Sequence, residues 1–249
     1  MESNLTDRRG RTVINKVLIM IPAYNEEKTV GEVVKSTRTL YPKFKVVVID
    51  DGSEDQTAQN AEEAGADVVS LPFHCGGSVA IQTGYLLAMN HNYEYTVKID
   101  ADGQHKPEEI SKMLDPLIND EADVTVGSRY LRLNMSEGSM VKDGGRVFSS
   151  SLVSLLRKTE ITDVTSGMRA WNRKAIRTLL PIYLERGLIE DSVFWVVETF
   201  LLSKKGLELK EVPIEVLPRR YGKSKSFTLN KMLVYPARFI ATLLEAIKS

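Results

Sequence analysis

The sequence predicts an α/β fold in which a mostly parallel sheet is flanked by helices and a C-terminal amphipathic helix follows. Three observations support this class. Short apolar runs alternate with helical segments along the first half of the chain. The runs lack the polar alternation of a half-exposed strand, so both of their faces should be buried. Polar clusters follow three of the runs, at the strand ends where open parallel sheets bind their ligands.

Five strands are expected in the first half of the chain. Each is a short run dominated by apolar and β-branched residues, which suit a pleated and buried surface. The strands cover Val17–Ile21, Lys45–Ile49, Asp67–Ser70, Tyr95–Ile99 and Asp123–Val126. Their spacing leaves room for a helix between neighbours, as a parallel sheet requires.

A helical segment follows each of the first four strands. The first opens at Asn25–Glu27, and its apolar residues then recur at helical spacing. The next ones cover Asp55–Ala64, Val79–Asn90 and Pro107–Ile118. The proline of the last segment suits a first helical turn, where no backbone N–H is needed.

The second half of the chain is less regular. Its expected elements are helices over Asp143–Leu156 and Val193–Leu202, an edge strand over Glu208–Val216 that Pro213 interrupts, and a basic loop over Arg219–Lys225. An apolar stripe at helical spacing follows. We therefore expect a polar tail over residues 1–14, one domain over 15–228 and an amphipathic helix over 229–249.

Composition excludes some classes of function. The 33 basic residues balance the 33 acidic ones, whereas a general nucleic-acid binder usually has a basic excess, so no nucleic-acid partner is expected. Cys75 is the only cysteine, so no internal disulfide can form. Neither a signal peptide nor an apolar run of about 18 residues is seen. We expect a cytoplasmic protein, with peripheral attachment to the cytoplasmic face of a membrane left open.

The sharpest candidate site is Asp100-Ala-Asp102-Gly-Gln104-His105, which directly follows the fourth strand. Two carboxylates two residues apart can share a hard divalent cation, and the Gln104 carbonyl can add an oxygen ligand. Mg²⁺ and Mn²⁺ prefer such oxygen ligands and keep positions for substrate phosphates. The alternative is a solvated acidic turn, but two further polar clusters at strand ends favour a metal site.

Those two clusters are Pro22-Ala-Tyr24-Asn25-Glu26 and Asp50-Asp51-Gly52-Ser53. An aromatic ring can stack on a nucleobase, and a carboxylate can accept hydrogen bonds from a base or a ribose. The alternative is that these are helix-capping turns, and we expect one of the two adjacent aspartates to be a cap.

The three clusters, in this order and spacing, resemble those of family 2 glycosyltransferases. Three later segments resemble the dolichol-phosphate mannose synthase and polyprenyl-phosphate glycosyltransferase branch: Gly127-Ser-Arg-Tyr130, Thr162-Asp-Val-Thr-Ser-Gly-Met-Arg169 and Arg219-x-Tyr-Gly-x-Ser-Lys225. The resemblance spans about residues 15–228. It implies a GT-A (Rossmann-like) fold and an inverting, metal-dependent sugar transfer.

The resemblance also implies residue roles. The nucleotide would be bound by Pro22, Tyr24, Glu26, Ile49, Asp51, Asp100 and Ala101. Mg²⁺ or Mn²⁺ would be held by Asp100, Asp102 and Gln104. Phosphates would be bound by Arg129, Arg219 and Lys225. The catalytic residues would be Asp102, Arg129 and Asp163.

The role of Asp163 stays open at this point. An alcohol acceptor needs a general base, whereas a lipid phosphate is already ionised, so that Asp163 would orient the acceptor instead. A purely structural role, as a cap or as a partner of Arg169, is the alternative. Glu190–Asp191 competes for the acceptor role, and Glu198 on an apolar helix is a candidate partner for a basic residue.

One loop departs from the family pattern. Many relatives have Asn-x-Gly-Lys-Gly after the third strand, but this chain has Phe73-His-Cys-Gly-Gly-Ser78. The lysine is missing, while the glycines still permit close approach of the backbone to a ligand. We interpret His74 as a polar loop residue and assign no catalytic role to Cys75.

The predicted activity is transfer of a sugar from a GDP- or UDP-sugar to a polyprenyl or dolichyl phosphate. The alternatives are a saccharide or other non-lipid acceptor, or a catalytically silent nucleotide-binding protein. The basic loop at residues 219–225 favours an anionic acceptor. The helix over 229–249 would lie on a membrane, pack on the domain or form a dimer. A separate membrane subunit and a homo-oligomer are further partners to consider, and the sequence does not identify the sugar.

Overall fold

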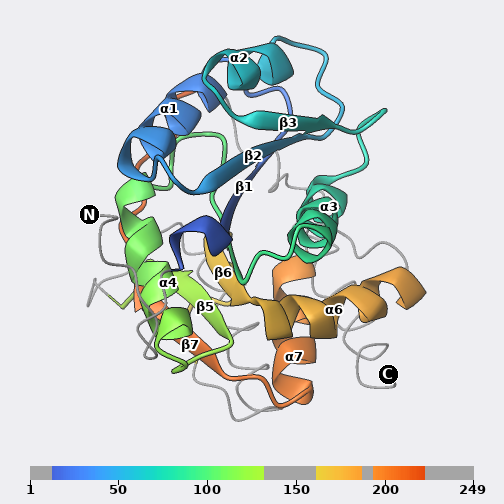
Figure 1. Ribbon diagram of the computed structural model, residues 1–249, viewed down its shortest axis with the longest axis vertical. Helices are drawn as coiled ribbons and strands as arrows, with labels where there is room; N and C mark the ends of the chain where they lie inside the picture. Colours follow the sequence, from blue (N-terminus) through green and yellow to red (C-terminus); the bar gives the residue numbers. More distant parts are fainter. Residues whose placement is uncertain (1–12, 132–160, 187–192, 222–249) are drawn as a thin grey trace, which may run out of the picture.

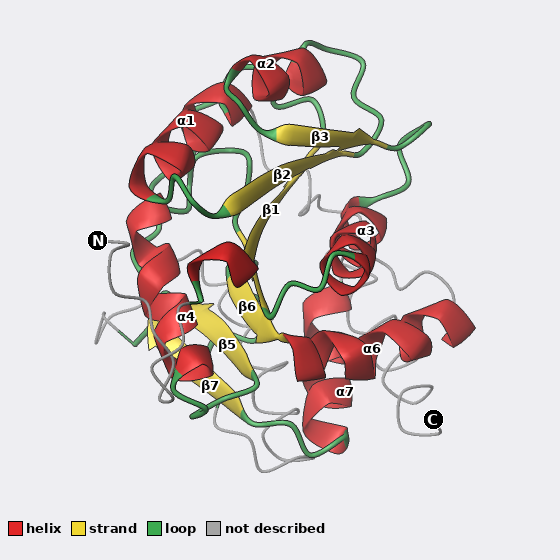
Figure 2. Cartoon of the chain, in the orientation of Figure 1, coloured by secondary structure: helices red, strands yellow, loops and turns green. Residues whose placement is uncertain are grey.

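The computed structural model describes residues 13–131, 161–186 and 193–221. Within these residues, seven strands form one sheet with the order β3-β2-β1-β4-β6-β5-β7. Helices cover both faces of the sheet (Figures 1 and 2). The predicted α/β architecture is confirmed.

All the predicted strands within these ranges form, with small shifts at their ends. They are β1 (Val17–Ala23), β2 (Lys45–Asp50), β3 (Asp67–Ser70), β4 (Tyr95–Lys98), β5 (Val124–Ser128) and β7 (Leu209–Pro213). Strand β1 includes Pro22, which lies beyond the last residue that pairs with β4. On that side its missing N–H therefore removes no ladder bond. Strand β7 lies at the edge of the sheet and ends at Pro213, as expected.

Strand β6 (Arg169–Asn172) was not predicted. It lies between β4 and β5 and runs antiparallel to both, whereas the other neighbouring pairs in the sheet are parallel. The sheet is therefore mixed but mostly parallel. Polar residues at both ends of β6 hide it in the sequence, and its pairing on both sides fixes it as a strand.

The helices agree with the predicted segments, apart from one that was missed. They are α1 (Val30–Leu40), α2 (Thr57–Glu63), α3 (Gly77–Asn90), α4 (Ile110–Ile118), α6 (Arg173–Arg186) and α7 (Phe194–Lys204). Short 3₁₀ turns lie at η2 (Ile14–Lys16) and η3 (Pro107–Glu109). Pro107 occupies the first turn of η3, as predicted. Helix α6 was not predicted, because Pro181 in its interior suggests a break.

Two apolar cores lie on opposite faces of the sheet. Side chains alternate along β1, so Ile19 and Ile21 join the core under α1 and α4, while Leu18 and Met20 join the core under α3, α6 and α7. This packing fixes the carboxyl ends of β1, β2 and β4 at a common edge, where the loops that follow them meet.

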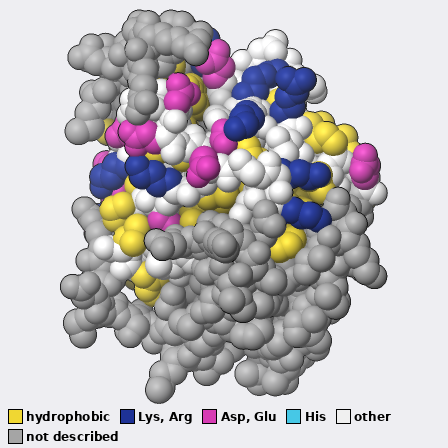
Figure 3. Space-filling model, turned by 90° about the horizontal axis from the view of Figure 1, so that it is seen from below, with side chains coloured by type: hydrophobic (Ala, Val, Ile, Leu, Met, Phe, Trp, Pro, Cys, Tyr) yellow, Lys and Arg dark blue, Asp and Glu magenta, His cyan; other side chains and the backbone are white. Residues whose placement is uncertain are grey.

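Several expectations fall outside the described residues: the helix over Asp143–Leu156, the pair Glu190–Asp191, Lys225 and the segment 229–249. Among the helices that the structure describes, none has the length and hydropathy needed to cross a bilayer. On the face shown in Figure 3, the visible acidic and basic side chains are interspersed with apolar ones.

Candidate active site

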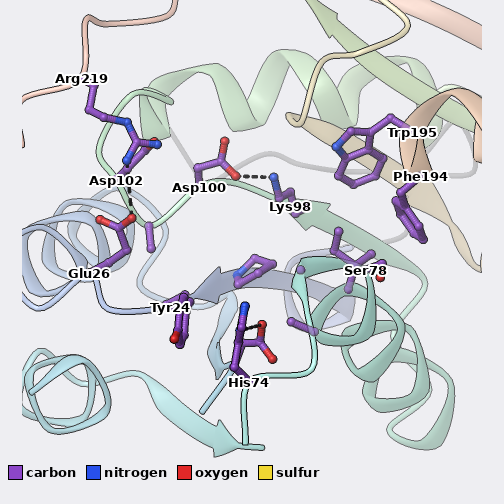
Figure 4. A pocket seen from close by; sticks show the side chains of 17 residues that line it. Tyr24, Glu26, His74, Ser78, Lys98, Asp100, Asp102, Phe194, Trp195 and Arg219 are labelled. Carbon is purple, nitrogen blue, oxygen red and sulfur yellow. Dashed lines mark hydrogen bonds and ion pairs between the residues drawn. The ribbon is translucent and has the colours of Figure 1, made fainter. Parts of the chain in front are cut away.

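A pocket of 320 Å³ lies beyond the carboxyl ends of β1, β2 and β4. Figure 4 shows its side chains converging from the strand ends, from α7 and from the segment after β7. Of the residues predicted to bind nucleotide, metal or phosphate, it brings together Pro22, Tyr24, Glu26, Asp51, Asp100, Ala101, Asp102 and Arg219. The pocket also contains residues that the sequence did not single out: Lys98, Ser78, Phe194 and Trp195.

Asp100 meets a buried lysine at the floor of the pocket. The Lys98 ammonium, on the last residue of β4, donates a hydrogen bond to Asp100 Oδ1. It also lies 5.3 Å from the ring centroid of Trp195. Burial on its own would raise the pKa of Asp100, but the charges of Lys98, His105 and Arg219 outweigh it and hold the pKa well below its usual range. Asp100 is therefore a carboxylate at any physiological pH.

Asp102 is buried and meets Arg219. One Arg219 nitrogen donates to Asp102 Oδ2, and another lies 3.6 Å from Glu26 Oε1. The other oxygen of Asp102 accepts the backbone N–H of Gln104 at 3.0 Å. Arg219, which lies far along the chain, thus joins two of the three clusters predicted from the sequence, through its contacts with Asp102 and Glu26.

The segment that follows Asp102 is held in place by its own side chains. The Gln104 amide donates to the Leu217 carbonyl at 3.1 Å, and Gln104 does not line the pocket. The buried His105 accepts the Asp100 N–H at its Nδ1 atom, with a distance of 3.1 Å. Burial lowers the pKa of His105, despite the opposing charge of Asp100. Through this hydrogen bond His105 fixes the turn that presents both carboxylates.

The two aspartates fit a divalent cation by the chemistry of the donor set. Both line the same pocket, and both are oxygen ligands. In the part of the chain that the structure describes, no group of three or more His, Cys, Asp or Glu side chains could enclose a metal. Two carboxylates without a closed protein cage suit Mg²⁺ or Mn²⁺, which leave coordination positions for substrate phosphates.

Asp51 organises the loop that departs from the family pattern. Its two oxygens accept the N–H groups of Cys75 and Gly76 at 2.7 and 3.0 Å. His74 Nδ1 lies 2.8 Å from Asp51 Oδ2, and the His74 ring stacks on Tyr24 with centroids 3.8 Å apart. His74 is therefore a pocket residue. It contacts Asp51 and Tyr24, two of the residues that were predicted to bind the nucleotide.

The turn after β2 explains the remaining residues of that cluster. Asp50 Oδ1 accepts the N–H of Ser53 within this turn, but α2 begins only at Thr57 and has no side-chain cap, so the expectation that one of the two adjacent aspartates caps the helix is wrong. Gly52 has a φ of +69°, and a Cβ atom there would lie 2.4 Å from the Phe73 carbonyl carbon. Ile49 is fully buried within the sheet and does not line the pocket.

Asp163 and Arg129 form a bidentate ion pair. Arg129 Nε and Nη2 donate to the two oxygens of Asp163 at 2.7 and 2.8 Å, and the Asp163 side chain is fully buried. Burial alone would lower the pKa of the Arg129 guanidinium, but its contacts with Asp163 raise it. The suggested pairing of Asp163 with Arg169 is wrong, because Arg169 turns to the opposite side and pairs with Glu198.

The loop that carries Asp163 is anchored at both ends. Glu211 on β7 accepts the Asp163 N–H at 2.7 Å and the Thr162 hydroxyl at 2.8 Å. At the other end, a Cβ atom on Gly167 would lie 2.9 Å from the Lys98 ammonium. The loop therefore approaches the Lys98–Asp100 pair closely, and a side chain at this position would require the Lys98 ammonium to shift.

Arg169 and Glu198 form a buried ionic cluster behind the pocket, and both side chains are fully buried. Arg169 donates to the Thr199 hydroxyl and to the Val164 carbonyl, at 2.9 and 2.6 Å. Its guanidinium also lies 4.7 Å from the ring centroid of Trp195. Glu198 accepts the Tyr85, Tyr183 and Trp171 side chains at 2.7, 3.0 and 3.2 Å. The expected basic partner of Glu198 is thus confirmed as Arg169.

Sequence reasoning missed Lys98, and a signal for it was present. A lysine inside an apolar strand is costly to bury unless it is paired, and Asp100 lies two residues further on. By contrast, no local pattern marks Trp195 or Phe194, because they belong to a helix that is apolar all round.

With this geometry in view, comparison with known proteins defines the family. The family model for Glycosyl transferase family 2 matches residues 18–180. This segment contains the three clusters at the strand ends and the Asp163 loop. The chain belongs to glycosyltransferase family 2.

Two characterised relatives cover most of the chain. One is a polyprenol monophosphomannose synthase from Mycolicibacterium smegmatis, 31% identical over 84% of this chain and 80% of the relative. The other is a UDP-N-acetylglucosamine–dolichyl-phosphate N-acetylglucosaminyltransferase from Methanococcus voltae, 28% identical over 84% of this chain and 88% of the relative.

A solved structure supports the fold. Glucosyl-3-phosphoglycerate synthase from Mycobacterium tuberculosis, crystallised with Mn²⁺, UDP-glucose and phosphoglyceric acid, has a TM-score of 0.70 to this chain. The likeness covers 93% of this chain and 79% of that one, at 21% sequence identity. The fold is therefore that of the GT-A glycosyltransferases.

Proposed function

We propose that this protein transfers a sugar from a nucleotide-sugar donor to a polyprenyl or dolichyl phosphate, with inversion at the sugar carbon. The observation that carries the proposal is the pocket in which Asp100, Asp102 and Arg219 converge. It combines carboxylates for a metal with a guanidinium for phosphate oxygens. The acceptor is supported by the names of the two relatives, both of which act on polyprenyl-type phosphates.

Asp100 and Asp102 would hold Mg²⁺ or Mn²⁺. The metal, when bound, neutralises the charge that develops on the leaving nucleoside diphosphate. Tyr24, Glu26 and Asp51 line the adjoining part of the pocket and would bind the nucleoside, with His74 stacked beside them. Binding of UDP- and GDP-sugars to the purified protein distinguishes a uridine donor from a guanosine donor.

The geometry of Asp163 favours an acceptor that is already ionised. Both of its oxygens accept hydrogen bonds from Arg129, and its side chain is buried. A carboxylate held in this way is poorly placed to remove a proton from an alcohol, but well placed to orient Arg129. Arg129 would then bind the acceptor phosphate, which attacks the sugar without a general base. Lys225 is proposed as a further phosphate-binding residue.

The acceptor lipid places the reaction at a membrane surface. We propose peripheral attachment, through residues 229–249 or through a separate membrane subunit.

A ligand panel tests the donor and the metal together. Purified protein is heated with UDP- and GDP-sugars, with and without Mn²⁺, and transfer to a polyprenyl phosphate is then measured with the best ligand. We expect one nucleotide class to raise the melting temperature only with the metal, because a ligand that binds the native state stabilises it. The Asp102→Ala variant should lose this shift and turn over roughly 100-fold or more slowly, whereas Glu62→Ala on the exposed side of α2 should behave as wild type. Unchanged turnover in Asp102→Ala would refute the metal role.

A further inference from the structure

Two protein cations lie on the two metal-binding carboxylates, and they differ in kind. Lys98 is two residues from its partner Asp100, on the same strand, and its side chain is 6% exposed. Arg219 comes from the segment after β7, 117 residues from its partner Asp102, and its side chain is 23% exposed. Figure 4 shows Lys98 beside Asp100, and Arg219 on the other side of the pair of carboxylates, next to Asp102.

The surroundings of the Lys98 side chain hold it in place at the base of the pocket. It is enclosed by the Trp195 ring on one side and by the close approach of Gly167 on another. Among the residues that the structure describes, the Arg219 guanidinium pairs with Asp102 and Glu26, and both of these acidic side chains line the open pocket. The contact between Arg219 and Asp102 is therefore easier to break than the contact between Lys98 and Asp100.

Arg219 occupies the outward oxygen of Asp102. The other oxygen of this carboxylate is taken by the backbone N–H of Gln104, which belongs to the fixed turn. A divalent cation that binds Asp102 through the oxygen outside this turn therefore meets the guanidinium of Arg219 there. A guanidinium beside the incoming cation would also repel it, because both are positively charged.

We infer that Arg219 acts as a stand-in for the metal, so that metal and guanidinium compete for Asp102 until a nucleoside diphosphate binds. The diphosphate offers Arg219 new oxygen partners, which match its forked geometry. Once Arg219 moves to the phosphates, Asp102 is released for the metal. Metal and nucleotide then favour each other's binding, and by linkage each must raise the affinity of the other by the same factor. This inference rests on the proposed function for the identity of the two ligands.

The test is a Mn²⁺ titration of the whole protein without nucleotide, followed by electron paramagnetic resonance of the free ion. The variants are Arg219→Gln and Arg219→Met, because a methionine offers no oxygen ligand of its own. We expect both to bind Mn²⁺ roughly tenfold more tightly than wild type, within the usual range of 5- to 150-fold for such couplings. The neighbouring Arg220 pairs with Glu32 outside this pocket, so Arg220→Gln is the matched control and should leave the affinity unchanged.

The second arm repeats the titration with saturating UDP or GDP. Wild type should gain affinity for Mn²⁺ with the nucleotide that it binds, and in both Arg219 variants this gain should shrink by at least half on a logarithmic scale. Unchanged or weaker Mn²⁺ binding by the Arg219 variants without nucleotide would overturn the inference, as would an equally tightened Mn²⁺ binding by Arg220→Gln without nucleotide. Because the first arm uses neither donor nor acceptor, a failure of sugar transfer would reject the proposed function and leave this result standing.

Discussion

At the scale of single residues, the contacts of Asp163 bear on its role in the proposed reaction. Sequence patterns left it as a general base, an orienting group or a structural partner. Its two oxygens accept hydrogen bonds from Nε and Nη2 of Arg129, and the Thr165 hydroxyl donates a further one to Oδ1 at 3.2 Å. These contacts support the proposal that Asp163 orients Arg129 and does not accept a proton from the substrate.

The pair can be tested as a unit. If Asp163 acts by holding Arg129, the variants Asp163→Asn, Arg129→Met and the double variant should lose turnover to a similar extent, on the order of 100-fold, because residues that act together are not additive. The donor KM should change little. A rate measurement on all three decides, and losses that multiply in the double variant would contradict the idea.

At the scale of elements, the Arg169–Glu198 cluster joins parts of the chain that lie far apart in sequence. It connects β6, α3, α6 and α7 through hydrogen bonds from Tyr85, Tyr183 and Trp171 to one carboxylate. Burial raises the pKa of Glu198, and the Arg169 charge and these hydrogen bonds oppose that rise. The cluster therefore holds a charged pair where apolar packing would otherwise be expected.

Removal of one member should be costly. Glu198→Ala leaves Arg169 buried without its carboxylate, and we expect a loss of about 3–5 kcal/mol in the free energy of unfolding. Urea denaturation followed by circular dichroism measures this. Glu185→Ala on the exposed side of α6 is the control and should change stability by less than about 0.5 kcal/mol. A loss no larger than that of the control would show that the cluster does not stabilise the fold.

The elements also show what a sequence can and cannot predict. Strands β1 to β5 were predictable because each is an apolar run that needs no partner to be recognised. Strand β6 begins with Arg169 and ends with Asn172, so only its pairing with β4 and β5 makes it a strand. The carboxylates of the pocket were predictable from their place after strands. His74 and Trp195 were not, because their roles come from contacts across the fold, whereas Lys98 could have been found from its place in an apolar strand two residues before Asp100.

At the scale of the whole molecule, the proposed attachment to a membrane involves a segment outside the described residues. The stripe predicted over residues 229–249 combines apolar positions with Lys231, Arg238 and Lys248. Such a pattern suits the surface of an anionic bilayer.

Flotation with liposomes tests this attachment. The full chain should float with vesicles that contain anionic lipid and remain behind with neutral ones, and raised salt should weaken the binding. A chain that ends at residue 228 should lose flotation while keeping the nucleotide-dependent rise in melting temperature. Equal flotation of the shortened chain would remove the membrane role from this segment.

The contact between Asp102 and Arg219 also bears on how the molecule is made. Because 117 residues separate the two partners, the ribosome delivers both carboxylates of the pocket well before the arginine that covers one of them. During that interval the nascent chain has an acidic edge without its late counter-ion. Until Arg219 has been made, Lys98 is the positive side chain that contacts this pair of aspartates. The charge balance of the pocket is therefore complete only after residue 219 has been synthesised.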